Sequence, residues 1–261
     1  MATLKLHDIL WEVKGAGPSP EDNRRTEIYF AGCQKALSGN PCKNCFNPQL
    51  WSNKNNIPID VKDIVRNLEV HKIPKYITIV GGEPTDQLDG LLELISMLKE
   101  KDYHIMLFTW RSFSWLYDFI GLEDIRKIDI LVTEPYDENY RIYDSLKDDG
   151  IHNAIGSGNQ EIYISQPNGK CEYYKAEYVN SMEVDKDNNV IVHLTDKQRK
   201  SHNINKKILK AAKILTKNCE KNTTCDKCLF LVHAGHCILQ RSGPWNWAFE
   251  IKNRELRKSG D

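Results

Sequence analysis

Three cysteines lie on one short segment that follows an apolar, strand-like run. They are Cys33, Cys42 and Cys45. Three thiolates on one loop can bind three corners of a cubane iron–sulfur cluster, and the fourth iron then stays open to a substrate. A zinc site is the alternative, but zinc needs a fourth ligand to complete its tetrahedron, and this loop offers no further cysteine or histidine. The pattern therefore favours a 4Fe-4S cluster with one open iron.

A second segment whose residues could bind a ligand is Gly81-Gly82-Glu83-Pro84, directly after an apolar run at residues 76–80. Glycine lets backbone come close to a ligand, and a carboxylate can meet a cation. In most proteins such a segment is only a turn. Here both it and the cysteine loop follow expected strands, so we expect them on the same rim of the fold. Together the two motifs are far more specific than either alone.

Four more cysteines lie close together near the C-terminus, with a Cys-x2-Cys pair at their centre: Cys219, Cys225, Cys228 and Cys237. Four thiolates can complete either a closed structural zinc site or a fully ligated 4Fe-4S cluster, and His233 or His236 could replace one of them. Taken alone, the segment favours zinc. In a chain that already binds one cluster, an auxiliary 4Fe-4S cluster becomes the preferred interpretation.

Strand-like and helical segments alternate from Thr26 to about residue 165. The expected strands are residues 26–32, 76–80, 104–109, 128–132 and 161–164. Three amphipathic helices are expected between them, and their apolar faces are Val61, Ile64, Val65 and Leu68 behind a cap at Asp60; Leu88, Leu91, Leu92, Ile95 and Leu98 behind a cap at Asp86; and Trp115, Leu116, Phe119 and Ile120. This alternation predicts an α/β barrel or open sheet of parallel strands, with its site at the carboxyl ends of the strands.

The pattern changes after Pro167. Residues around Val184 and 190–194 flank a DKDNN turn, which predicts a β-hairpin. One further helix is expected from its apolar positions Ile204, Ile208, Ala211, Ala212 and Leu215. We therefore expect three parts: a core over residues 1–165, a β-hairpin addition over 166–200, and a helix with the four-cysteine module over 201–261.

Composition and charge restrict the class of protein. The 261 residues are 40% hydrophobic and 28% charged, and Lys plus Arg equals Asp plus Glu at 36 each, which gives a formal net charge of zero. This composition is typical of a globular protein. Because the net charge is zero, no overall electrostatic attraction draws the chain to nucleic acid or anionic lipid. Charges at Lys5, Asp8, Glu12 and Lys14 argue against a signal peptide, and no run is long enough to span a membrane. We expect a cytoplasmic protein, in which cysteines serve more often as metal ligands than as disulfides.

The successive segments resemble the radical S-adenosylmethionine superfamily, and within it the activating proteins of anaerobic ribonucleotide reductase and other glycyl radical enzymes. The resemblance covers about residues 4–165 and is carried by GAGP, RRTEIYFAGC, CKNCFNPQLW, GGEP, LFTWRS, IDILVTEPY and GSGNQEI. It implies a partial (β/α)6 barrel in which S-adenosylmethionine chelates the unique iron through its amino and carboxylate groups. It also implies a flavodoxin- or ferredoxin-type reductant.

Residue by residue, the resemblance implies that Cys33, Cys42 and Cys45 bind the cluster and that the segment Gly81 to Pro84 binds the methionyl amino group. The side chains that it places near ribose and adenine are Phe46, Thr109, Ser157, Asn159 and Gln160. The usual spacing is Cys-x3-Cys-x2-Cys, whereas eight residues here separate the first two cysteines. Loop closure grows only slowly in cost with length, so the longer loop can still surround the same cluster. The residue before the third cysteine, often aromatic, is Asn44.

The function implied is reductive cleavage of S-adenosylmethionine to a 5'-deoxyadenosyl radical, which abstracts a hydrogen atom from a peptide or protein residue. The auxiliary module favours peptide modification. Installation of a glycyl radical on an anaerobic reductase or related enzyme is the alternative. A non-catalytic zinc or iron–sulfur electron carrier is the alternative of another class, and the GGEP segment beside a three-cysteine loop argues against it.

Cys171 and the tryptophans are isolated candidates. Cys171 is interpreted first as an ordinary thiol, and alternatively as a hydrogen-atom donor to a substrate radical. Four tryptophans are interpreted as packing residues and not as a binding site, namely Trp110, Trp115, Trp245 and Trp247.

Overall fold

The computed structural model describes residues 2–14, 17–20, 22–141, 155–176, 179 and 181–193, together with 207, 210, 231–232 and 236–237. The chain divides into two compact units, Met1–Thr195 and Asp196–Asp261. In the second unit, β11 (Leu231–Val232) pairs antiparallel with β12 (His236–Cys237). The helix expected around Ile204 to Leu215 lies mostly outside the described residues.

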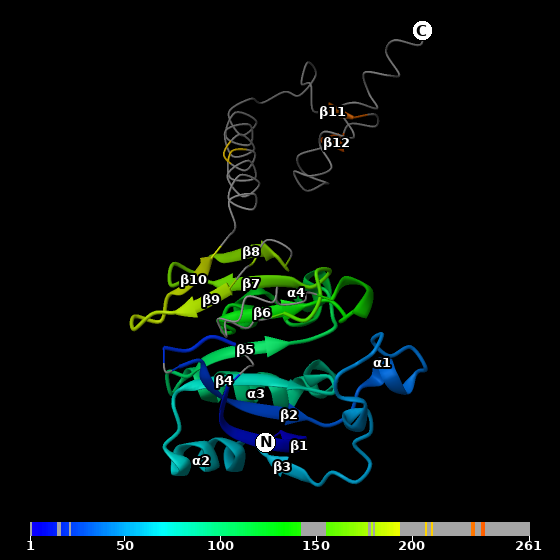
Figure 1. Ribbon diagram of the computed structural model, residues 1–261, viewed down its shortest axis with the longest axis vertical. Helices are drawn as coiled ribbons and strands as arrows, with labels where there is room; N and C mark the ends of the chain where they lie inside the picture. Colours follow the sequence, from blue (N-terminus) through cyan, green and yellow to red (C-terminus); the bar gives the residue numbers. More distant parts are fainter. Residues whose placement is uncertain are drawn as a thin grey trace. The chain divides into compact units, whose positions relative to one another are not determined.

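The first unit is built on an eight-stranded mixed sheet with the order β3-β1-β2-β4-β5-β6-β7-β8 (Figure 1). The strands are β1 (Thr3–Lys14), β2 (Arg24–Phe30), β3 (Pro58–Asp60), β4 (Tyr76–Gly81), β5 (His104–Phe108), β6 (Ile130–Thr133), β7 (Glu161–Ser165) and β8 (Cys171–Lys175). The sheet is open, because β3 and β8 lie at its two edges. The mixed α/β class expected from the sequence is confirmed.

The centre of the sheet is parallel and its flanks are antiparallel. Strands β2, β4, β5 and β6 run parallel, whereas β1 pairs antiparallel with β2 and β3. Strand β7, which the alternation placed in the parallel series, runs antiparallel to β6 and to β8, so that part of the prediction is wrong. No helix of the described residues connects β7 to β8. The turn around Gly169 joins them as a hairpin, since the amide of Gly169 donates to the carbonyl of Gln166 at 2.9 Å.

Helices α2 (Val61–His71) and α3 (Leu88–Lys99) cover one face of the sheet, with α4 (Phe113–Phe119) and α5 (Leu122–Ile125) beyond them. Helix α2 confirms its prediction. The Asp60 carboxylate accepts from the amide of Lys62 at 2.8 Å, and the four apolar residues of its expected face are buried: Val61, Ile64, Val65 and Leu68. These side chains join the core formed by Ile28, Ile77 and Ile105 of the parallel strands.

Helix α3 begins later than its sequence suggested. A 3-10 turn, η2 (Pro84–Gln87), precedes it, and Gln87 stands at its N-cap position without a side-chain hydrogen bond. The predicted cap at Asp86 is therefore wrong. The buried face is also rotated, because Leu94 is buried where Leu88 and Leu92 are only partly so. The Asp86 carboxylate instead accepts a hydrogen bond from the amide of Gln34.

The opposite face of the sheet carries a second core, which includes Met106, Ile130, Val132 and Ile162. At the amino ends of the strands this face holds Arg25, which is 0% exposed. Its guanidinium donates to five acceptors: Thr78 Oγ1, the carbonyls of Pro18, Ile77 and His104, and Nδ1 of His104. Because arginine only donates, His104 Nδ1 must accept, and the ring proton then lies on Nε2. Burial lowers the pKa of His104 to about 4, so this ring stays neutral.

The predicted hairpin is confirmed by β9 (Ser181–Val184) and β10 (Val190–His193), which pair antiparallel. The Asp185 carboxylate closes the turn by accepting from the amides of Asp187 and Asn189, each at 2.9 Å. Among the described residues, no helix is long and apolar enough to cross a membrane.

Candidate functional site

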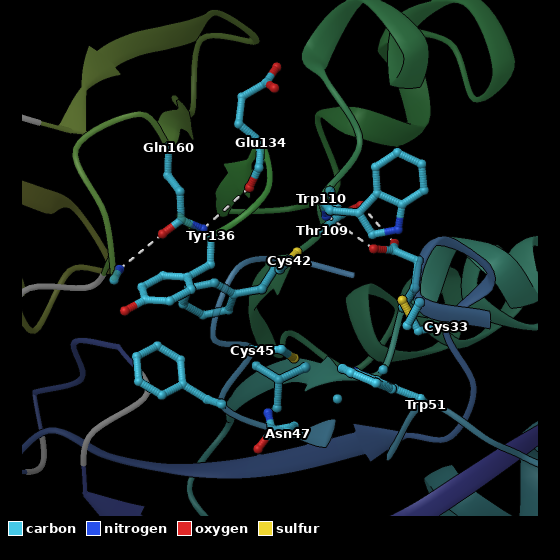
Figure 2. Close-up of a pocket in the computed structure, with 18 of the residues that line it drawn as sticks. Cys33, Cys42, Cys45, Asn47, Trp51, Thr109, Trp110, Glu134, Tyr136 and Gln160 are labelled. Atoms are coloured by element: carbon cyan, nitrogen blue, oxygen red, sulfur yellow. Dashed lines mark hydrogen bonds between the residues drawn. The ribbon is translucent and has the colours of Figure 1, made fainter. Parts of the chain in front are cut away.

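A cavity of about 370 Å³ lies at the carboxyl ends of β4, β5 and β6. It brings together many of the residues singled out in the sequence: Cys33, Cys42, Cys45, Phe46, Gly81, Gly82, Glu83, Thr109 and Gln160. Figure 2 shows the three cysteine side chains around the same space, with Trp51 on one side and Trp110 on another. Motifs that are far apart in the chain thus meet at the edge of the sheet where strand-end ligand sites are expected.

The cysteine loop is fixed at both ends by backbone hydrogen bonds. The amide of Cys33 donates to the carbonyl of Trp51 at 2.9 Å, and the amide of Cys45 donates to the carbonyl of Cys42 at 3.2 Å. Between them, the extra residues fold into the short helix α1 (Gln34–Leu37) and a turn at Gly39, which has φ +85°. The long spacing is therefore taken up by local structure, and both ends of the loop still reach one cavity.

Two of these thiols, Cys33 and Cys42, lie where burial disfavours their ionisation. Burial raises the pKa of Cys33 to about 11, and the charges of Glu83 and Asp86 add to this effect. Burial also raises the pKa of Cys42. Bound iron would reverse this preference, because a metal-bound thiol loses its proton. Among the cysteines whose side chains the structure describes, none forms a disulfide.

The cysteine side chains around the cavity suit a cluster better than a single metal ion. Within the described residues, no three His, Cys, Asp or Glu side chains are grouped closely enough to hold one metal ion. A cubane cluster binds each thiolate at a separate iron, so its ligands need only surround a shared space. The three thiols that line the cavity satisfy that condition. The donor set therefore fits an iron–sulfur cluster.

The two glycines of the GGEP segment allow strand β4 to end beside strand β2. A Cβ atom on Gly81, which has φ +123°, would lie 2.3 Å from the backbone nitrogen of Phe30. On Gly82 it would lie 2.1 Å from the carbonyl oxygen of Gly32. The amide of Gly82 donates to the Phe30 carbonyl at 2.9 Å. The glycines are thus required by the approach of two backbones, in addition to any approach of a ligand.

Glu83 joins the ends of β4 and β5. It is 1% exposed, and its Oε1 accepts from the hydroxyls of Thr85 and Thr109 at 2.6 and 2.7 Å. Its Oε2 accepts from the amide of Trp110 at 3.0 Å. Burial raises the pKa of this carboxyl, although the hydrogen bonds oppose the shift. Among the described residues, Oε2 accepts this one hydrogen bond, so it has a second acceptor position for a ligand.

The loop at residues 155–160 is organised by side chains that the sequence assigned to ligand contact. Gln160 Oε1 accepts from the amides of Gly156 and Ser157 at 3.0 and 3.1 Å, and Gln160 also lines the cavity. Ser157 and Asn159 are not among the lining residues. Ser157 Oγ accepts from the Asp137 amide, and Asn159 Nδ2 donates to the Pro135 carbonyl. Pro84, also absent from the lining, is buried at the start of η2.

Several lining residues were not predicted from the sequence: Trp51, Trp110, Glu134, Tyr136 and Gly156. Phe46, which is 59% exposed, packs against Tyr136 with ring centroids 4.5 Å apart. Trp110 was interpreted as packing, yet it lines the cavity, and its buried Nε1 has no partner among the described residues. Its place directly after the strand HIMLFT was the signal that could have identified it.

The remaining candidates fall outside this cavity. Cys171 begins β8, where it pairs with Ser165, and burial raises the pKa of its thiol. Cys219, Cys225 and Cys228 lie outside the described residues, as do Trp245 and Trp247. Cys237 is described only as part of strand β12.

Comparison with known proteins assigns a family to this arrangement. Residues 13–163 match the family model described as a 4Fe-4S single cluster domain, and this range is more than half of the chain. The chain belongs to that family of iron–sulfur proteins. Over 91 residues it is 33% identical to the pyruvate formate-lyase-activating enzyme of Streptococcus mutans serotype c (strain ATCC 700610 / UA159), a match that covers 33% of each chain. The chain therefore matches about a third of the length of this relative.

Proposed function

We propose that this protein is a radical S-adenosylmethionine enzyme whose cluster is held by Cys33, Cys42 and Cys45. The observation that carries the proposal is the meeting of these thiols with the GGEP segment in one cavity at the strand ends. The parallel strands β2, β4, β5 and β6 at the centre of the open sheet are consistent with this proposal. The family of the chain and the name of its relative support the same assignment.

When bound and reduced, the cluster supplies the electron that cleaves S-adenosylmethionine into methionine and a 5'-deoxyadenosyl radical. The protein residues bind, orient and exclude water. Glu83 offers an acceptor for the methionyl ammonium, and Trp110 Nε1 offers a donor. Val80 and Phe108 give the cavity an apolar wall on the side of the sheet, which protects a radical from solvent.

The substrate that we propose is a residue of a peptide or protein, from which the radical removes a hydrogen atom. Two specific activities follow from different observations. The name of the relative favours activation of a glycyl radical enzyme, whereas the four C-terminal cysteines favour modification of a peptide. Both need a mouth that admits a polypeptide, and the exposed Phe46 stands at the rim of the cavity. A flavodoxin- or ferredoxin-type protein is the proposed reductant.

Anaerobic reconstitution of the Cys42→Ala variant tests the proposal. We expect it to lose formation of 5'-deoxyadenosine under dithionite, because one iron would lack its protein ligand. The matched control is Ser38→Ala, an exposed side chain of the same loop that does not line the cavity. The control should produce 5'-deoxyadenosine at the parent rate. An active Cys42 variant would mean that another residue supplies the third ligand.

Substrate choice can be tested with the same assay. A glycyl radical signal at a purified reductase or lyase in electron paramagnetic resonance would support activation. Deuterium transfer from a labelled peptide into 5'-deoxyadenosine would support peptide modification. If S-adenosylmethionine is cleaved but neither the glycyl radical signal nor the deuterium transfer is seen, both proposed substrates are refuted and the cluster assignment stands.

A further inference from the structure

We propose that Asp86 is a positioning residue for Cys33 and that its charge lowers the reduction potential of the bound cluster. The inference rests on the proposed cluster site. Asp86 follows the GGEP segment by two residues and does not line the cavity. Asp86 contacts the backbone next to Cys33 and is proposed to contact neither the cluster nor S-adenosylmethionine.

The geometry that supports this role is a hydrogen bond between two segments far apart in the chain. Asp86 Oδ2 accepts from the amide of Gln34, the residue after Cys33, at 2.6 Å. Cys33 is the N-cap residue of α1 and makes no side-chain hydrogen bond there. The first free amide of α1 is thus satisfied by a carboxylate from η2. Because a charge-assisted bond is roughly twice as strong as a neutral one, it restrains the direction of the Cys33 backbone.

The other oxygen of Asp86 is also engaged. Oδ1 pairs with Arg111 Nη2 at 3.1 Å, and the Asp86 side chain is only 7% exposed. The Arg111 guanidinium lies 4.0 Å from the ring centre of Trp110 and 4.3 Å from that of Trp115, so two aromatic faces hold it in place. Arg111 therefore holds the carboxylate oxygen of Asp86 that does not accept from Gln34.

A carboxylate beside the cluster opposes the addition of an electron. The charges that face Cys33 are those of Glu83 and Asp86. Arg111 balances part of the Asp86 charge, whereas no cation among the described residues pairs with Glu83. Net charge and hydrogen bonding around a cluster are the main controls of its potential, and a low potential is what reduction of a sulfonium requires.

The first test uses the metal-free protein and needs no cofactor. Alkylation of Cys33, followed by peptide mass spectrometry, measures how well its backbone is held. In the parent protein Cys33 is 8% exposed and should react slowly. Asp86→Ala removes the acceptor and should speed the reaction about tenfold. Asp86→Asn keeps an acceptor oxygen for Gln34 but loses the charge that disfavours the Cys33 thiolate, as Asp86→Ala does, so it should react faster than the parent and clearly more slowly than Asp86→Ala. Equal rates in Asp86→Asn and Asp86→Ala would overturn the positioning role.

The second test measures the midpoint potential of the reconstituted cluster. Asp86→Asn should retain the cluster and raise the potential, by about 59 mV if the ratio of reduced to oxidised cluster changes tenfold. The matched control is Asp89→Asn, an exposed carboxylate in the first turn of α3, which should leave the potential unchanged. An unchanged potential in Asp86→Asn, or an equal shift in the control, would overturn the charge effect. A parent protein without a cluster would instead refute the proposed function, and the alkylation result would still decide the positioning role.

Discussion

Glu83 shows how one buried side chain can serve both the fold and the ligand. Replacing it by Ala should weaken binding of S-adenosylmethionine at least about tenfold, because a charge-assisted hydrogen bond to the ammonium is lost. The change should also lower the melting temperature, since Thr109 and Trp110 lose their acceptor. Calorimetry on the reconstituted protein measures the affinity. The control is Glu93→Ala, which removes a carboxylate on α3 away from the cavity. An unchanged dissociation constant for the Glu83 variant would mean that S-adenosylmethionine binds elsewhere.

His104 predicts a pH dependence of stability at the opposite end of the strands. Its pKa is about 4 in the folded protein because of burial, and about 6.5 when exposed. Between these values the unfolded chain binds more protons, so stability present above pH 6.5 is lost as the pH falls toward 4. The loss attributable to this ring is about 3 kcal/mol. Urea unfolding at pH 7.5 and at pH 4 measures this loss, and His104→Gln should reduce the pH dependence of stability while the exposed His7→Gln keeps it.

At the scale of elements, the junction of β2 and β4 depends on Gly82. Gly82→Ala would place its Cβ 2.1 Å from the Gly32 carbonyl, so the two strand ends must separate. We expect a loss of more than about 2 kcal/mol in the free energy of unfolding and poor cluster retention. Gly39→Ala is the control. Nothing lies within 4 Å of that position, so only its φ of +85° opposes a side chain, at about 1 kcal/mol. Equal effects in both variants would contradict this account.

The elements also show what the sequence alone could predict. Helix α2 was predicted correctly because its cap, its period and its burial all agree. Strand β1 was not predicted, because its charged residues alternate with apolar ones and one side of the strand is exposed. Asp86 was assigned to α3 since an acidic residue before an apolar run resembles a cap, and only the folded chain brings the Gln34 amide to it. The cavity was predicted from strand ends, but its aromatic walls come from positions without periodicity.

At the scale of the whole chain, the sequence predicts two clusters, and this stays a prediction. Reconstituted protein should contain about eight irons per chain, four at each site, with Mössbauer parameters of 4Fe-4S centres. The variant Cys225→Ser with Cys228→Ser should lose half of the iron and keep the cavity cluster. About four irons with one zinc would replace the auxiliary cluster by a structural zinc site. The division of the chain at Thr195 makes the C-terminal unit a separate target for these substitutions.

The buried Arg25 bears on which parts of this protein can be altered by directed evolution. Its five contacts fix the amino ends of β2, β4 and β5, and lysine, with three donors, cannot reproduce them. The cavity is at the other end of the same strands. Randomising rim positions such as Phe46 and Tyr136 should therefore change substrate preference while most variants remain folded. A library at Arg25 and its neighbours should yield few folded members, so we expect the tolerant positions at the rim of the cavity and not at the starts of β2, β4 and β5.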